Sequence, residues 1–236
     1  MSVGPSPWVL ASGSPRRRAL LSGAGARFDV KAVDIDETPQ AGEDPLAYCQ
    51  RMAETKARVG AERLGDGRVT LGSDTVVVLD GQILGKPRDE SHARDMLTSL
   101  SGRRHAVVSA WALASGPRLL RLDHRVSDVS FRTLTTEEVR TYVETGEPMD
   151  KAGAYGIQGY GGALVEGFSG DFSTIIGLPL SPVLDDLVAA QAEPAPVSAV
   201  ARRAAIIRGR IAAACDGIAR SASEVVLVGA SKSQPL

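Results

Sequence analysis

Cysteine is scarce in this sequence, whose 236 residues include only Cys49 and Cys215. Two cysteines can form neither a disulfide framework nor a zinc site built from four thiolates. The sequence also lacks an apolar run of the roughly 18 residues that a membrane-spanning helix needs. Its first residues show neither the basic nor the apolar region of a secretory signal. We therefore expect a cytoplasmic protein that does not have a membrane as a partner.

Net charge is small as well, because 27 basic residues almost cancel 28 acidic ones and leave −1 at pH 7. This balance gives no global electrostatic reason to expect nucleic acid as a partner. The 43% of hydrophobic and 23% of charged residues are typical of a folded globular protein. The length suggests one sizeable domain, which we place at 1–190, with an Ala/Pro-rich linker at 191–201 and a tail at 202–236.

Apolar periodicity and capping residues predict interleaved strands and helices. Strands are expected at 8–11, 28–33, 69–71, 76–79, 83–84, 105–114 and 119–131, and helices at 15–21, 45–64, 90–100, 135–145 and 180–190. Asp80-Gly81 and Gly116-Pro117 stand between apolar runs and predict antiparallel hairpins. The fold class is therefore α/β, with a mixed sheet flanked by helices. The glycine-rich stretch 151–177 is too polar and too broken to predict a helix.

The turn from Ser12 to Arg17 lies between a predicted strand and a predicted helix. Ser14 suits the N-cap of that helix, and Pro15 suits its first position. Free N–H groups and the positive end of a helix dipole bind phosphate well, and the side chains of Arg16 and Arg17 add further donors. The alternative is a capped helix with solvated arginines, although arginine in a first turn opposes the helix dipole.

Two acidic residues are candidates for metal binding and for general-base chemistry. Asp74 follows Gly72, and we place this segment at a break between two apolar strands. A carboxylate at a strand end can hold a divalent cation or accept a proton from water, but an Asx turn accounts for a single aspartate equally well. Glu37 offers a second oxygen ligand, although a solvated acidic loop is the simpler interpretation of its surroundings.

Two lysines and one glutamine complete the set of candidates. Lys86 lies in Gly85-Lys-Pro, which is not a Walker A loop but fixes a point charge suited to phosphate. Lys56 lies within a long predicted helix, where a solvated surface lysine is the simpler interpretation. Gln158 lies in a glycine-rich segment, where its amide can read the edge of a base; the alternative is an irregular loop.

Other forms of chemistry have less support. The three histidines lack ligand spacing, and we interpret them as structural. No nucleophile elbow occurs, and neither cysteine has the context of an activated thiolate, so covalent catalysis is not expected. Acidic groups together with fixed cations favour metal-assisted chemistry on a phosphorylated ligand.

Several blocks of sequence occur in one order over residues 7–190. They are Leu10-Ala-Ser-Gly-Ser-Pro-Arg-Arg17, Gly72-Ser-Asp-Thr-Val-Val77, Gly85-Lys-Pro87, Leu100-Ser-Gly102, Asp150-Lys-Ala-Gly-Ala-Tyr-Gly-Ile-Gln158 and Gly177-Leu-Pro-Leu180. Together they resemble the Maf family of nucleoside triphosphate pyrophosphatases. The resemblance implies an inosine-triphosphatase-like two-lobed fold with a central cleft, a homodimer, and a divalent metal cation, Mg²⁺ or Mn²⁺, as cofactor. It also implies cleavage of a nucleoside triphosphate between its α and β phosphates.

The same resemblance implies roles for individual residues. Asp74 is implied to accept the proton of the attacking water, and the catalytic group comprises Asp74, Glu37 and Lys86. The metal ligands are Asp74 and Glu37. The residues that handle phosphates are Ser12, Arg17, Lys56 and Lys86, and those that set base preference are Arg16, Thr75 and Gln158.

The base-reading residues distinguish two branches of the resembled family. Arg, Thr and Gln occur in the branch that hydrolyses dTTP and UTP, whereas the branch acting on 7-methyl-GTP has Trp at the arginine position and Glu at the glutamine position. We therefore expect a dTTP/UTP pyrophosphatase. The alternative is a non-catalytic nucleotide-binding regulator of septum formation and cell division, which would not need the acidic residue at position 74.

The tail at 202–236 resembles the opening of YggS-type pyridoxal-phosphate-binding barrel proteins, with Lys232 at their Schiff-base position. The sequence does not contain the rest of such a barrel. We therefore expect a truncated fragment without function of its own.

Overall fold

The computed structural model of this chain describes residues 6–190. The predicted linker and the tail with Lys232 therefore lie outside the described residues. The strands are β1 (Trp8–Leu10), β2 (Asp29–Val30), β3 (Val69–Leu79), β4 (Gln82–Leu84), β5 (Arg104–Ser115), β6 (Arg118–Phe131) and β7 (Val165–Ser169). The helices are α1 (Pro15–Gly23), α2 (Pro45–Leu64), α3 (Glu90–Leu100), α4 (Thr136–Glu144), α5 (Phe172–Ile176) and α6 (Leu180–Ala189), and the short 3-10 turns are η1 (Glu147–Asp150), η2 (Ala152–Ala154) and η3 (Gly159–Leu164).

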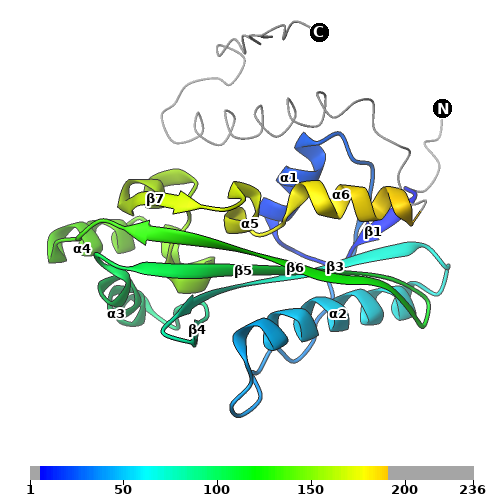
Figure 1. Cartoon of the computed structure of the whole chain (residues 1–236), viewed down its shortest axis with the longest axis horizontal. Coiled ribbons are helices and arrows are strands. Elements are labelled where there is room, and N and C mark those ends of the chain that lie inside the picture. The colour runs from blue at the N-terminus through cyan, green and yellow to red at the C-terminus, as the bar shows by residue number, and fades with distance from the viewer. Residues whose placement is uncertain (1–5, 191–236) are drawn as a thin grey trace, which may run out of the picture.

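The strands form one seven-stranded mixed sheet in the order β2-β1-β3-β5-β6-β7, and β4 pairs with β3 beside this path. β1 pairs in parallel with β2 and β3, whereas the other pairs are antiparallel. Figure 1 shows helices on both sides of this sheet. The predicted fold class, a mixed sheet flanked by helices, is confirmed.

Local signals account for most element ends. The Ser14 side chain caps α1 and Pro15 begins the helix, and α2 ends at Gly65, whose φ of 62° is left-handed. The turn between β3 and β4 contains Asp80 and Gly81, both with positive φ, as expected for a two-residue hairpin. These elements formed as predicted because caps and turns depend on neighbouring residues alone.

β3 corrects one prediction about Asp74. The strand runs unbroken through this residue, so the predicted break and the Asx turn are both wrong. Gly72 is required not by a turn but by α2, since a Cβ at that position would lie 2.3 Å from the Ala53 carbonyl oxygen and 2.4 Å from the Ala57 nitrogen. The missing side chain lets α2 lie directly against β3.

The stretch 151–177 is more regular than its composition predicts. It contains two 3-10 turns, strand β7 and helix α5, which the Asp171 side chain caps. The sequence pattern missed β7 because the strand has no clear alternation and takes its backbone partners from Asp128–Phe131 of β6. The predicted strand at 28–33 is also shorter in the structure, where β2 covers two residues.

Alternation along β3 divides the core between the two faces of the sheet. Figure 1 shows α2 on one face and α1, α5 and α6 on the other. Leu71 packs with Val183 of α6, whereas Val76 packs with Met52 of α2, because neighbouring strand residues point to opposite faces. A third cluster around Phe131 joins α3 and α4 to the end of the sheet opposite β1.

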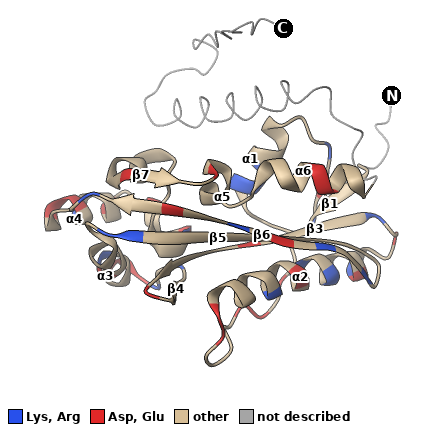
Figure 2. Cartoon of the chain, viewed as in Figure 1, with Lys and Arg blue, Asp and Glu red and all other residues tan. Residues whose placement is uncertain are grey.

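Charged residues of both signs occur along α2 and the long strands, as Figure 2 shows. This pattern agrees with the small net charge of the sequence. Within residues 6–190, none of the helices has both the length and the apolar character that a membrane crossing requires.

Candidate functional site

The candidate site lies where one edge of β3 has no neighbouring strand. On this edge β1 pairs with residues 69–71 and β4 pairs with residues 77–79. Among the described strands, none pairs with residues 72–76 there, although β5 pairs with the opposite edge along the same stretch. A cleft of about 680 Å³, lined by Asp74, opens at this gap. The volume lies within the usual range of small-molecule sites.

Segments from far apart in the sequence meet in this cleft. All nine residues proposed as site residues line it: Ser12, Arg16, Arg17, Glu37, Lys56, Asp74, Thr75, Lys86 and Gln158. The acidic residue of β3 and the candidate cations therefore share one cavity.

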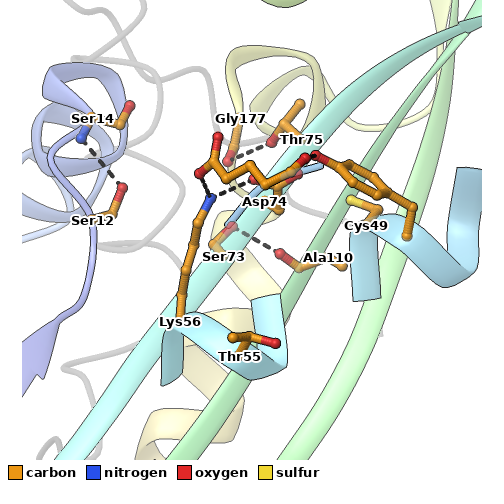
Figure 3. Close-up of polar contacts among 12 residues, drawn as sticks. Ser12, Ser14, Cys49, Thr55, Lys56, Ser73, Asp74, Thr75, Ala110 and Gly177 are labelled. Atoms are coloured by element: carbon orange, nitrogen blue, oxygen red, sulfur yellow. Dashed lines mark hydrogen bonds and ion pairs between the residues drawn. The ribbon is translucent and has the colours of Figure 1, made fainter. Parts of the chain in front are cut away.

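Lys56 connects the two acidic side chains of the site. Its Nζ lies 2.7 Å from Asp74 Oδ1 and 2.6 Å from Glu37 Oε1, and Figure 3 shows it reaching from α2 toward Asp74. Only 8% of Lys56 is exposed, so its interpretation as a solvated surface lysine is wrong. The helix pattern could not reveal this, since the burial of Lys56 follows from the close approach of α2 to β3 at Gly72.

Two residues of α2 hold the loop that carries Glu37. The Tyr48 hydroxyl donates to the Glu37 carbonyl oxygen at 2.7 Å. Arg51 donates to both carboxylate oxygens of Glu43 at 2.6 Å, and this hydrogen-bonded pairing lowers the pKa of Glu43 to about 2. The Thr38 carbonyl oxygen also accepts a hydrogen bond from Arg51. The loop is therefore held against α2 at Glu37, Thr38 and Glu43.

The cations of the cleft keep Glu37 ionised. Burial alone raises the pKa of Glu37, but the hydrogen bond and charge of Lys56, together with the charges of Lys86 and Arg17, hold it below its ordinary value. Glu37 is thus an ionised carboxylate in the field of three cations, on a loop that stays exposed to solvent as the alternative interpretation expected.

Arg17 is buried, and its guanidinium joins three segments of the chain. Its Nε donates to the Gly177 carbonyl oxygen at 2.9 Å, and its two terminal nitrogens donate to Ser12 Oγ at 3.1 Å and Thr75 Oγ1 at 3.2 Å. Thr75 Oγ1 also lies 3.1 Å from the same carbonyl oxygen, and Figure 3 shows this pair. Arg17 is not a solvated arginine; it fixes the first turn of α1 against β3.

Arg16 lies beside Arg17 but pairs with the far side of the cleft. Its NH1 lies 2.8 Å from Asp150 Oδ2, and Lys151 Nζ lies 2.7 Å from the other carboxylate oxygen of Asp150. Both Asp150 and Lys151 line the cleft. They belong to the sequence block that ends at Gln158, but the pattern assigns neither of them a role, because a partner 134 positions away is visible only in the fold.

The glycine-rich segment is joined to the loop that carries Lys86. The Gly153 N–H donates to the Gly85 carbonyl oxygen at 3.0 Å, which brings Lys86 and Gln158 to the rim of one cleft. Tyr155 of this segment is buried and shares a 2.8 Å hydrogen bond with His105. His105 therefore packs in the core behind the cleft, as a structural histidine does.

Comparison with known proteins places the chain in a family. A family model described as Maf-like protein matches residues 7–190. The chain belongs to the Maf-like protein family. The resemblance inferred from the sequence blocks is confirmed over this range, whereas the YggS-type resemblance concerns residues outside it.

Relatives of this Maf-like protein include enzymes named dTTP/UTP pyrophosphatase. The one from Shewanella denitrificans is 53% identical over 182 residues, which cover 73% of this chain and 90% of the relative. Those from Yersinia pestis and Escherichia coli O157:H7 are each 47% identical over 171 residues, covering 72% of this chain and 86% of each relative.

A divalent cation fits this Maf-like site only where substrate phosphates supply some of its oxygen ligands. Within residues 6–190, no three His, Cys, Asp or Glu side chains are grouped so that they could hold a metal ion. However, the Asp74 and Glu37 carboxylates both contact the ammonium of Lys56, so they are neighbours on one side of the cleft. Mg²⁺ commonly binds through one or two carboxylates, substrate phosphates and water. The residues present fit that kind of site.

Proposed function

We propose that this protein hydrolyses nucleoside triphosphates, dTTP and UTP in particular, to the nucleoside monophosphate and pyrophosphate. The observation that carries the proposal is one cleft that Asp74 lines together with the cations Lys56, Arg17 and Lys86, and in which Lys56 contacts Asp74. The names of the Shewanella, Yersinia and Escherichia relatives support the same activity.

The cations would bind the triphosphate. Ser12 and the N-terminal end of α1 offer hydrogen-bond donors and a positive dipole end to a phosphate. Lys86 adds an exposed ammonium from the opposite rim. Charge that develops on the phosphate oxygens during the reaction is stabilised by cations that are already in place.

Asp74 would serve as the general base. Its carboxylate accepts a proton from water, and the water oxygen forms a bond to the α phosphorus. The bond between the α phosphorus and the oxygen that bridges to the β phosphorus breaks, and pyrophosphate leaves with that electron pair. One water is consumed for each nucleoside monophosphate and pyrophosphate formed.

Asp74 and Glu37 are the residues that would hold Mg²⁺ or Mn²⁺ against the phosphates. When bound, the cation supplies charge neutralisation of the phosphate oxygens. Lys56 contacts both carboxylates and so orients them between α2 and β3 before substrate arrives.

Base preference would depend on Arg16 and Gln158, whose side chains line the rim of the cleft near Asp150. The Thr75 hydroxyl already contacts Arg17, Gly177 and Ser109, so we propose that Thr75 acts by orienting Arg17 rather than by touching the base. The homodimer that the family resemblance implies and the cytoplasmic location expected from the sequence both stay predictions.

The test is pyrophosphate release from a panel of dTTP, UTP, CTP, ATP, GTP and 7-methyl-GTP with Mg²⁺ or Mn²⁺. We expect kcat/KM for dTTP and UTP to exceed that for the others by roughly 10-fold or more. Equal amounts of monophosphate and pyrophosphate should appear. Nucleotide binding without any release would contradict the proposal and favour the non-catalytic regulator.

A further inference from the structure

A short turn beside the cleft carries two acidic side chains that reach in different directions. This turn is η1, and its first and last residues are Glu147 and Asp150. Lys151 fastens the turn, because its Nζ donates to the Glu147 carbonyl oxygen at 2.5 Å and lies 2.7 Å from Asp150 Oδ1. Lys151 therefore joins the backbone at the start of η1 to the carboxylate at its end.

Glu147 binds the backbone of the glycine-rich loop. One carboxylate oxygen accepts from the Gly161 N–H at 3.1 Å and from the Tyr142 hydroxyl at 2.8 Å, and the other accepts from the Tyr160 N–H at 3.0 Å. A charged acceptor with several donors forms stronger hydrogen bonds than a neutral one. The segment that follows Gln158 is thus tied to η1.

Tyr142 extends this attachment to the other side of Gln158. Its hydroxyl donates to Glu147 and accepts from the Gly156 N–H at 3.2 Å. Burial, with the nearby charge of Glu147, raises the pKa of Tyr142, so the hydroxyl stays protonated and able to donate. Glu147 and Tyr142 therefore clamp the loop at Gly156 and Gly161, with Gln158 between the clamped positions.

The glycines of this loop are required by the clamp. A Cβ on Gly159, where φ is 74°, would lie 2.7 Å from Glu147 Oε2. A Cβ on Gly161 would lie 2.3 Å from the Gly156 carbonyl oxygen and 2.6 Å from the Tyr142 hydroxyl. The loop lies against the Glu147 carboxylate and the Tyr142 hydroxyl with no room for a side chain at Gly159 or Gly161. This close fit limits the positions that Gln158 can take.

We infer that η1 is the positioning element for base recognition: Glu147 fixes the loop of Gln158, and Asp150 fixes Arg16. This inference rests on the proposed function, since it assigns to η1 the orientation of the two residues proposed to read the base. The Glu147 carboxylate is bound by Tyr142, Tyr160 and Gly161, whereas the phosphate-binding groups come from α1, α2 and the loop after β4. Loss of the Glu147 carboxylate should therefore change base preference and leave phosphate binding intact.

The test compares Glu147→Gln with Glu144→Gln, a matched change three residues earlier on α4, where Glu144 pairs with Arg140 away from the cleft. The amide introduced at position 147 presents a donor where the carboxylate accepted from a backbone N–H, so at least one loop contact is lost. We expect kcat/KM for dTTP to fall roughly 10-fold, mainly through KM, while that for ATP changes by less than about 3-fold. Inhibition by imidodiphosphate, which has no base, should be unchanged, and Glu144→Gln should match the wild type in every measurement.

A second, milder variant keeps the test valid if Glu147→Gln fails to fold. Tyr142→Phe keeps the Glu147 contacts to the Tyr160 and Gly161 N–H groups and removes the two hydrogen bonds of the Tyr142 hydroxyl, to Glu147 and from Gly156. It should lower the dTTP preference by roughly 3-fold, less than Glu147→Gln does, because the contacts of Glu147 to the loop backbone remain. An unchanged dTTP/ATP ratio in both variants, or equal loss with every nucleotide, would overturn the inference. A wild-type chain that releases pyrophosphate from no nucleotide would instead overturn the proposed function.

Discussion

The Lys56 ammonium lies between two carboxylates, 2.7 Å from Asp74 and 2.6 Å from Glu37. The three side chains together carry a net negative charge, although Lys56 itself is buried. The arrangement explains why the acidic residue of β3 and the acidic loop before α2 belong to the same site.

We expect Asp74→Asn to lower kcat for pyrophosphate release by at least about 100-fold, because an amide cannot accept the proton of the attacking water. The free energy of unfolding should change little, since the amide oxygen still accepts from Lys56. Steady-state kinetics with dTTP and urea unfolding measure both effects. Asp80→Asn is the matched control, because Asp80 lies in the β3–β4 turn, pairs with Arg103 and has a left-handed φ that Asn tolerates. Near-normal turnover in Asp74→Asn would refute the assignment of the base.

Glu37→Gln should weaken the binding of Mg²⁺ more than the binding of the nucleotide. Removal of one of two carboxylate ligands is expected to raise the Mg²⁺ concentration for half-maximal activity by roughly 10-fold or more. Titration of Mg²⁺ into chelator-treated protein at saturating dTTP measures this shift. Asp34→Asn, an exposed residue of the same loop, should leave the Mg²⁺ titration unchanged. A Glu37→Gln curve that overlays the wild type would show that Glu37 does not hold the cation.

Gly72→Ala should destabilise the protein by about 3 kcal/mol, because the added methyl meets backbone atoms of Ala53 and Ala57 that cannot move without displacing α2. The same displacement would carry Lys56 away from Asp74, so activity should fall even in the folded fraction. Urea midpoints and dTTP kinetics below the transition check both parts. Gly167→Ala on β7, where a Cβ meets nothing within 4 Å, should leave the urea midpoint and the dTTP kinetics unchanged. An unchanged urea midpoint for Gly72→Ala would mean that α2 does not approach β3 this closely.

Local chemistry was enough to predict most of the fold. The Ser14 cap, the Gly65 helix end and the Asp80–Gly81 turn each depend on residues next to one another, and each formed where the sequence indicated. The break assigned before Asp74 failed for the opposite reason. Gly72 resembles a turn residue locally, whereas its actual requirement comes from a helix that begins 27 positions earlier, at Pro45.

The candidate site was predicted as a set of residues but not as an arrangement. Motifs and the family resemblance identified nine of the residues that line the cleft. The burial of Lys56 and Arg17, in contrast, follows from the packing of α1 and α2 on β3. The pairing between Arg16 and Asp150 joins residues 134 positions apart in the sequence. No local pattern encodes such a contact, so these roles became visible only in three dimensions.

Gln158→Glu should weaken the preference for pyrimidine nucleotides. The side-chain amide can both donate and accept, whereas an ionised carboxylate only accepts, so a base that presents an acceptor at this point loses its partner. We expect the dTTP/GTP ratio of kcat/KM to fall by roughly 10-fold. Gln82→Glu, on the exposed end of β4, is the matched control. A ratio that stays the same in Gln158→Glu would remove this residue from base recognition.

His105 makes stability depend on pH. Its ring is 3% exposed, packs edge-on against Phe131 and Tyr155, and bonds the Tyr155 hydroxyl through Nε2. Burial lowers the pKa of His105 from its ordinary 6.5 to about 4. The folded protein therefore keeps the imidazole neutral over a range in which the unfolded chain binds a proton.

Between about pH 6.5 and pH 4 the unfolded chain binds more protons at His105 than the folded protein does. The free energy of unfolding should therefore be highest above this range and should fall as the pH is lowered through it. At about 1.4 kcal/mol per pH unit, the loss reaches about 3 kcal/mol at most. Urea midpoints measured from pH 7 to pH 4 test this. His105→Phe should be less stable at pH 7, since the Tyr155 hydroxyl loses its partner, but it should lose less on acidification than the wild type. His124→Gln, which changes a partly exposed histidine, should keep the wild-type slope. Parallel slopes for the wild type and His105→Phe would mean that some other group is responsible for the acid sensitivity.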